Sequence, residues 1–189
     1  MRKMLAKKHG FTLIEMMVVV AIVAVLATVG IPAFMNYIRR SKTSEAASNL
    51  KSMFVGAQAY YRRDSVGRGA ITDTSVVTSR SRCSVTTGST SNVPSSRKTV
   101  LNWATEPSRT SFESLNTQVA DPIYYQYSIT AANSGLCGGM ASTAAVYTFQ
   151  AIGNLDGDAI QSRFELAVGS NTNNDLYRAP GIFVQNELE

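Results

Sequence analysis

The chain has 189 residues but only one histidine, His9, and two cysteines, Cys83 and Cys137. Its carboxylates are scattered and not paired at a spacing typical of acid–base catalysis. After Gly10 the sequence therefore offers no Ser-His-Asp triad, no Cys-His pair and no set of metal ligands. These shortages argue against an enzyme, and we expect no cofactor.

The sequence also lacks a basic surface, although its formal net charge is +5. Four of the 18 basic residues precede Gly10, which leaves 14 against 13 acidic residues in the rest of the chain. We find no cluster of basic residues interleaved with aromatic ones, which is the pattern of a dedicated nucleic-acid site. We therefore predict no such site.

Between residues 11 and 35 the shortage is of charge, because Glu15 is the only charged residue there. A carboxylate in a membrane-length apolar segment costs about 2.5 to 3.5 kcal/mol on insertion scales, so it is expected to have a partner and a function. Cleavage after Gly10 would create an amine at Phe11, four helical positions from Glu15. The alternatives are a plain membrane anchor with a tolerated Glu, or a secretory signal peptide cut near residues 25–27.

Residues 11–63 contain no turn signal apart from Gly30 and Pro32, and they predict one long helix. The half at residues 11–35 is apolar all round, as a transmembrane or fibre-core segment must be. The half at residues 36–63 has apolar residues at intervals of three and four, which predicts an amphipathic helix packed on a globular head. Pro32 removes a helical hydrogen bond, so we predict a kink or local melting beside Gly30.

Residues 64–120 are rich in Ser and Thr and predict a long loop region on the surface. Residues 76–77 could form a short strand, and the run from Ser84 to Ser96 is expected to bury little. Glu106 and Glu113 are interpreted as solvated surface residues.

Residues 121–189 predict an antiparallel sheet. Apolar residues alternate at period two from Ile123 to Ile129 and again from Ile160 to Val168, and a third run spans residues 145–152. The last two runs flank residues 154–158, whose Asp-Gly pair predicts a hairpin turn. Three or four strands against the second half of the helix give an α+β fold.

Asp156 and Asp158 are weak candidates for a calcium site, because hard cations prefer clustered oxygen ligands. An EF-hand loop would need a glutamate at its twelfth position, which is Ala167 here. Turn chemistry explains the Asp-Gly-Asp sequence without a metal, and we predict none.

Cys83 and Cys137 both lie beyond the apolar segment, in the predicted head. In an oxidising exterior they are expected to form a disulfide, worth on the order of 4 kcal/mol by the chain-entropy model. A catalytic thiol or a metal site is the alternative, but the missing histidine leaves both without support.

The sequence Gly10-Phe11-Thr12-Leu13-Ile14-Glu15, after a basic leader of residues 1–10, resembles the class III signal sequence of prepilins. This superfamily comprises the type IV pilins and the pseudopilins of type II secretion, and the resemblance is strongest over about residues 8–63. It implies cleavage after Gly10 by prepilin peptidase, N-methylation of Phe11, and an assembly salt bridge made by Glu15. It also implies the pilin fold, a long helix on a small antiparallel sheet.

The resemblance further implies a structural subunit of a type IV pilus, which would serve motility or adhesion. The subunit would wait in the bacterial inner membrane with its leader in the cytoplasm, and would then join an extracellular helical filament. Its partners would be other copies of itself, prepilin peptidase, the inner-membrane assembly platform and membrane lipid. Gly30 and Pro32 would allow the helix to stretch during assembly. The alternatives are a type II secretion pseudopilin, or a minor pilin that primes assembly or takes part in DNA uptake.

Overall fold

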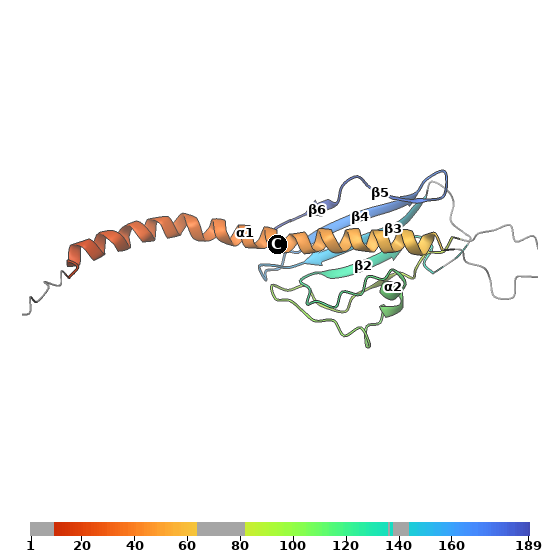
Figure 1. The fold of residues 1–189 in the computed structure, drawn as a ribbon, viewed down its shortest axis with the longest axis horizontal. Helices are drawn as coiled ribbons and strands as arrows, with labels where there is room; N and C mark the ends of the chain where they lie inside the picture. Colours follow the sequence, from red (N-terminus) through yellow and green to blue (C-terminus); the bar gives the residue numbers. More distant parts are fainter. Residues whose placement is uncertain (1–9, 64–81, 136, 138–143) are drawn as a thin grey trace, which may run out of the picture. The chain divides into compact units, whose positions relative to one another are not determined.

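The computed structural model describes residues 10–63, 82–135, 137 and 144–189. The chain forms two compact units, residues 1–38 and residues 39–189. Residues 76–77, for which the sequence allows a short strand, lie outside the described residues. The second unit contains a six-stranded sheet and the second half of the long helix (Figure 1).

Helix α1 spans Leu13–Tyr61, within two residues of the predicted limits at each end. No described residue of the first unit is buried. This part of α1 is long and apolar enough to cross a membrane, judged by length and composition. The residues around Gly30 and Pro32 remain α-helical, so local melting is not seen there, and the kink stays a prediction.

In the second unit α1 becomes amphipathic, as its sequence predicts. One face is buried against the sheet at intervals of three and four residues, and it consists of Thr43, Ala46, Leu50, Met53, Ala57 and Tyr61. This spacing places the side chains on a single stripe of the helix. The long helix on an antiparallel sheet is the expected α+β, pilin-like arrangement.

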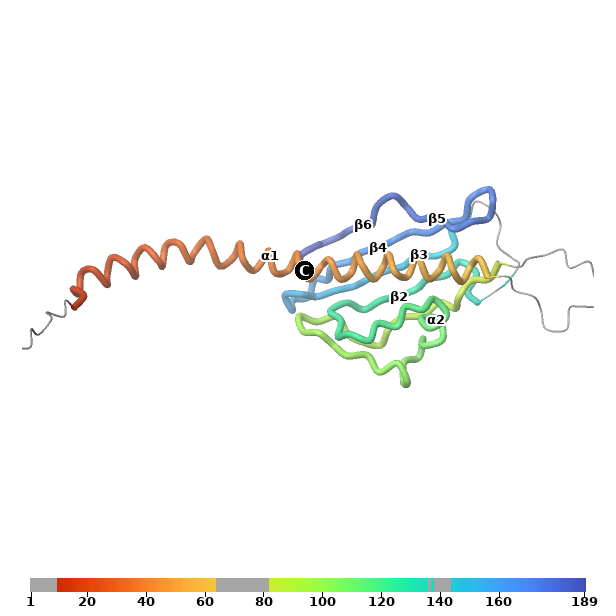
Figure 2. The backbone as a smooth tube through the Cα atoms, in the orientation of Figure 1, coloured from red at the N-terminus to blue at the C-terminus, as the bar shows by residue number. Residues whose placement is uncertain are grey.

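The sheet is antiparallel throughout, in the order β1-β2-β3-β4-β5, with β6 also paired to β4. The strands are β1 Gly88–Ser89, β2 Gln126–Ala131, β3 Ala145–Gly153, β4 Ser162–Ser170, β5 Leu176–Arg178 and β6 Phe183–Gln185. The backbone trace shows β2 to β4 as neighbouring strands (Figure 2). These three correspond to the three predicted runs, whereas the short strands β1, β5 and β6 were not predicted.

Along β2, every second side chain is buried, as the apolar pattern of the sequence predicts. Ile123 and Tyr125, just before the strand, and Tyr127 and Ile129 within it, are at most 2 % exposed. Ile160 is the exception among the predicted inward positions, since it is 51 % exposed and precedes β4. The inward row of β4 therefore begins at Ser162.

The segment between the two cysteines is more ordered than its composition suggests. It contains β1 and the short helix α2, Arg109–Ser114. The prediction that residues 84–96 bury little is wrong, because Val85 is buried and so are the polar residues Ser84, Thr90 and Asn92. Burial of these polar groups is tolerated because each makes hydrogen bonds. The amide of Asn92, for example, donates to the carbonyl of Tyr125 at 3.0 Å.

The interpretation of Glu106 as a solvated surface residue is also wrong. It is 8 % exposed, and its two carboxylate oxygens accept hydrogen bonds from the N–H of Ser91 at 3.0 Å and from the Ser91 hydroxyl at 2.5 Å. Glu113 is exposed as expected and pairs with Arg109 at 3.4 Å, one turn earlier in α2. Glu106 thus fixes the loop that leads from β1 to α2.

Candidate functional site

The N-terminal site is built around the start of α1. Gly10 and Phe11 are exposed and precede the helix, and Thr12 stands at its N-cap. The Thr12 hydroxyl accepts the N–H of Glu15 at 3.3 Å, and the Glu15 carboxylate accepts the N–H of Thr12 at 3.4 Å. This reciprocal pair is a capping box, which satisfies two of the N–H groups that a helix start leaves without partners.

The role of Thr12 was not predicted, although the signal is present in the sequence as Thr-x-x-Glu before an apolar run. In the described chain Phe11 is joined to Gly10, so its nitrogen is an amide and not an amine. The Glu15 carboxylate therefore bonds Thr12 and not a terminal amine. Cleavage after Gly10 would place a positive charge one residue from this cap.

The first unit presents an apolar surface on both sides of Glu15. Side chains of the first unit that are at least half exposed include Phe11, Leu13, Ile14, Val18, Val20, Val23, Val25, Leu26, Val29, Ile31 and Phe34. Isolated exposed apolar residues are ordinary on a soluble protein, but a continuous surface of this extent marks a site of association with protein or membrane. The geometry suits packing into lipid or against other apolar helices.

The second half of α1 is fixed to the sheet by a polar network centred on Glu45. Its carboxylate accepts the N–H of Tyr124 at 2.9 Å and lies 3.7 Å from the ammonium of Lys98. The hydroxyl of Tyr127 accepts the side-chain amide of Asn49 at 2.7 Å and lies 3.4 Å from the same carboxylate. Burial raises the pKa of Tyr127 well above its ordinary value, which keeps the hydroxyl protonated as a donor.

Cys83 and Cys137 form a disulfide, with their sulfur atoms 2.03 Å apart. The two residues also form an isolated antiparallel bridge outside the named strands. The bond closes a loop with a sequence separation of 54 residues. It joins the segment that follows α1 to the segment between β2 and β3, which is the staple that the sequence predicts.

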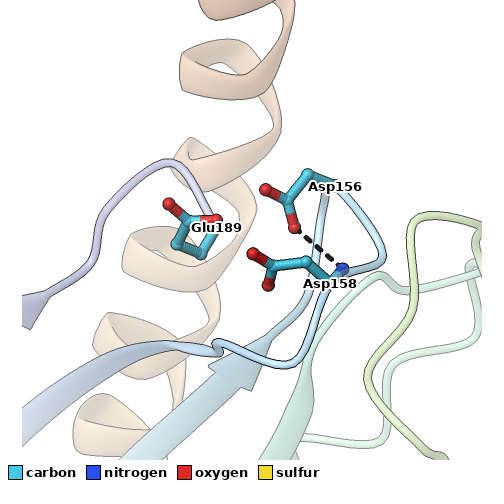
Figure 3. Close-up of side chains that lie close together, drawn as sticks. All are labelled: Asp156, Asp158 and Glu189. Carbon is cyan, nitrogen blue, oxygen red and sulfur yellow. Dashed lines mark hydrogen bonds between the residues drawn. The ribbon is translucent and has the colours of Figure 1, made fainter.

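Asp156 and Asp158 come together with Glu189, and one oxygen of each lies within 4.8 Å of the others (Figure 3). A hydrogen bond with Glu189 lowers the pKa of Asp156, and the same interaction raises the pKa of Glu189. The N–H of Asp158 also donates to Asp156 at 3.2 Å, and Gly157 has the positive φ of a turn residue. The bond from Asp158 and the conformation of Gly157 are turn chemistry, whereas Glu189 comes from the segment after β6; the absence of a metal stays a prediction.

Comparison with known proteins gives one family model and several partial relatives. Residues 5–31 match a model described as a prokaryotic N-terminal methylation motif. The type IV major pilin protein PilA of Myxococcus xanthus is 46 % identical over 55 residues, 29 % of this chain and 25 % of that protein. The type IV major fimbrial protein FimA of Dichelobacter nodosus is 50 % identical over 46 residues, 24 % of this chain and 30 % of that protein.

A fimbrial protein of Neisseria meningitidis is 40 % identical over 72 residues, 38 % of this chain and 42 % of that protein. The chain thus spans between a quarter and about two fifths of the length of these three relatives. No solved structure matches the chain.

Proposed function

We propose that this chain, a type IV pilin-like prepilin, is the structural subunit of a type IV pilus. It is inserted in the bacterial inner membrane through residues 11–35 and is cut after Gly10 by prepilin peptidase. Phe11 then becomes the methylated N-terminus. The observation that carries the proposal is the exposed apolar half of α1, which overlaps the methylation motif matched at residues 5–31 and contains Glu15 as its only charge.

The proposed assembly chemistry follows from the cost of burying that charge. A carboxylate surrounded by apolar helices is stable only when a cation compensates it. The cleaved Phe11 supplies an amine, and a neighbouring copy offset along the filament can bring its amine to Glu15. Each copy then needs another copy to satisfy its carboxylate, so the interaction is heterologous and generates an open helical polymer.

The exposed apolar half of α1 also explains how subunits are held in the membrane before they assemble. Lipid covers the apolar half of α1, while the unit of residues 39–189 lies outside the bilayer. The proposed partners are further copies of the chain, prepilin peptidase, the inner-membrane assembly platform and membrane lipid. The subunit then passes from the inner membrane to a filament outside the cell. The role is structural and non-enzymatic, in line with relatives named as pilins and fimbrial proteins.

The first test is the N-terminal mass of the protein from native membranes and from sheared surface material. We expect a terminus at Phe11 with one added methyl group, abundant in the sheared fraction. An intact Met1, or a terminus near Thr28, would refute processing as a prepilin.

The alternative within this class is a pseudopilin of type II secretion, or a minor pilin. The names of the matched relatives favour the pilin, since they are called major pilin or fimbrial proteins. Deletion of the gene separates the candidates: a major pilin predicts loss of surface filaments with normal secretion, whereas a pseudopilin predicts exoenzymes retained in the cell. A minor pilin predicts a terminus at Phe11 but little protein in the sheared fraction.

A further inference from the structure

Two lysine side chains converge on one aromatic ring in the unit of residues 39–189. The ammonium of Lys42, in α1, lies 4.7 Å from the centroid of the Tyr124 ring, and that of Lys98 lies 5.1 Å from the same centroid. Lys98 comes to the ring because the next residue, Thr99, forms an isolated antiparallel bridge with Ile123. Lys42, Lys98 and Tyr124 together are called the lysine–tyrosine cluster below.

The lysine–tyrosine cluster carries more positive charge than the described residues compensate. Glu45 supplies the only carboxylate that pairs with it in the part of the chain that the structure describes, and its Oε2 lies 3.7 Å from Nζ of Lys98. Lys42 has no ion pair among those residues. The face of the Tyr124 ring attracts both ammonium groups but adds no net charge. One positive charge is therefore left over at a partly exposed site, where it attracts an anion.

The position of the lysine–tyrosine cluster in the chain indicates which anion it meets. Residues 11–35, the proposed membrane span, rise roughly 37 Å as a helix, whereas the hydrocarbon core of a bilayer is about 30 Å thick. Lys42 follows seven residues, or about two helical turns, after residue 35. Its long side chain can therefore reach the layer of lipid headgroups, where phosphate diesters lie. Tyrosine is enriched at the same level of membrane proteins because its ring is amphipathic.

We propose that the lysine–tyrosine cluster binds the headgroup of an anionic phospholipid, in the leaflet opposite the leader. The ammonium groups donate hydrogen bonds to the phosphate diester, which also compensates the remaining positive charge. This contact fixes the depth of the subunit in the membrane before assembly. The proposal rests on the proposed insertion of residues 11–35, but it needs neither cleavage after Gly10 nor polymerisation. Lipid binding can therefore fail while processing succeeds, and the reverse.

The test is native mass spectrometry of the full chain in a nonionic detergent. The probes are phosphatidylglycerol and phosphatidylcholine with the same acyl chains, added in equal amounts. We expect the phosphatidylglycerol adduct to be preferred. Lys42→Gln and Lys98→Gln should each lower this preference about fivefold, the typical contribution of one lysine near an anionic surface, and the double variant should lower it about 25-fold. The basic leader is the same in every variant, so the differences report the cluster.

The matched control is Lys51→Gln, because Lys51 is an exposed lysine of the same helix and has no ion pair among the described residues. It lies nine residues beyond Lys42, and its replacement removes the same charge. This control should keep the preference of the unchanged chain. Equal preferences in Lys42→Gln and Lys51→Gln would overturn the proposal, and so would equal binding of the two lipids by the unchanged chain. Thermal melting verifies folding, and if Lys98→Gln does not fold, the other two variants decide the question.

A carboxylate from a second copy of the chain is the alternative occupant of the lysine–tyrosine cluster. Electron microscopy of sheared material from cells that carry both Lys42→Gln and Lys98→Gln distinguishes the two. Filaments together with a lowered lipid preference would support the lipid headgroup. Loss of filaments with an unchanged lipid preference would overturn the proposal and assign the cluster to a contact between copies. The N-terminal mass of the same material shows separately whether the subunit is processed.

Discussion

Arg39 and Asp156 form an ion pair between the first residue of the folded unit and the hairpin turn that joins β3 to β4, with Nη1 3.6 Å from Oδ2. The same Nη1 donates to the carbonyl of Leu188 at 3.3 Å. Both side chains are partly shielded, at 24 % and 16 % exposure. One guanidinium thus holds together the helix, the turn and the segment that follows β6.

Replacing Arg39 by Gln should loosen the segment after β6 without unfolding the unit. We expect faster amide hydrogen exchange at Glu189, whose N–H donates to the carbonyl of Asn186 at 3.2 Å within this segment, and a small fall in melting temperature. Arg40→Gln is the matched control, since Arg40 is exposed and has no ion pair among the described residues. Equal exchange rates in the two variants would mean that Arg39 does not hold this segment.

Gly56 allows α1 to touch the loop after α2. A Cβ atom at this position would lie 1.9 Å from the carbonyl oxygen of Leu115, which is backbone and cannot turn aside. Gly56→Ala should therefore lower the free energy of unfolding by about 1 to 3 kcal/mol, as overpacking does. Thermal melting followed by near-ultraviolet circular dichroism measures the change. Gly181→Ala is the control, because nothing lies within 4 Å of its added Cβ, and an equal loss there would refute the steric argument.

The sequence predicts the elements whose pattern is long and periodic. The long helix follows from apolar residues that recur every three to four positions, and strands β2 to β4 follow from apolar residues at every second position. Tertiary contacts do not change these spacings. The short strands β5 and β6 have three residues each, too few to show a period. They form because their backbones pair with the edge of β4. This long-range pairing is not visible in the local sequence.

The sequence also singles out some of the functional and structural polar residues but not others. Glu15 is conspicuous because it breaks an apolar run, whereas Arg39 and Glu106 occur among many polar residues of which few are buried. Their partners Asp156 and Ser91 are distant or unremarkable in the sequence. Such contacts depend on how the turn and the loop are folded back, so the residues alone predict only that they are polar.

Buried tyrosines should make the folded unit sensitive to alkali. Burial raises the pKa of Tyr147 to about 12 and raises that of Tyr125 and Tyr127 further. Unfolded tyrosines ionise near pH 10, so above that pH the unfolded state releases protons first and stability falls as pH rises. The expected slope is up to about 1.4 kcal/mol per pH unit for each tyrosine, until the folded pKa is reached.

Tyrosinate absorbance and circular dichroism, recorded over the same pH series, measure this effect. The absorbance of the buried tyrosines should rise together with the loss of structure. Tyr147→Phe should reduce the slope of unfolding free energy against pH by the contribution of one tyrosine. The substitution also removes the acceptor of the Val85 N–H at 3.1 Å. Ionisation of all tyrosines near pH 10 with the fold intact would contradict the prediction.

Glu15 can act as a helix cap and as a charge, and three variants separate these roles. Thr12→Ala removes half of the capping box and should cost about 1 kcal/mol of helix stability, but it leaves the carboxylate free to pair. Glu15→Gln keeps an oxygen that can accept the Thr12 N–H, but it removes the charge. Glu15→Ala removes both.

If the carboxylate pairs with the Phe11 amine of a neighbouring copy, Glu15→Gln should resemble Glu15→Ala and give no surface filaments. Thr12→Ala should still give them. Electron microscopy of sheared material scores filaments, and the N-terminal mass from membranes verifies that each variant is inserted and cut. Filaments from Glu15→Gln would show that capping, and not charge, is what assembly requires of this residue. Loss of filaments from Thr12→Ala alone would lead to the same conclusion, because only the cap differs there.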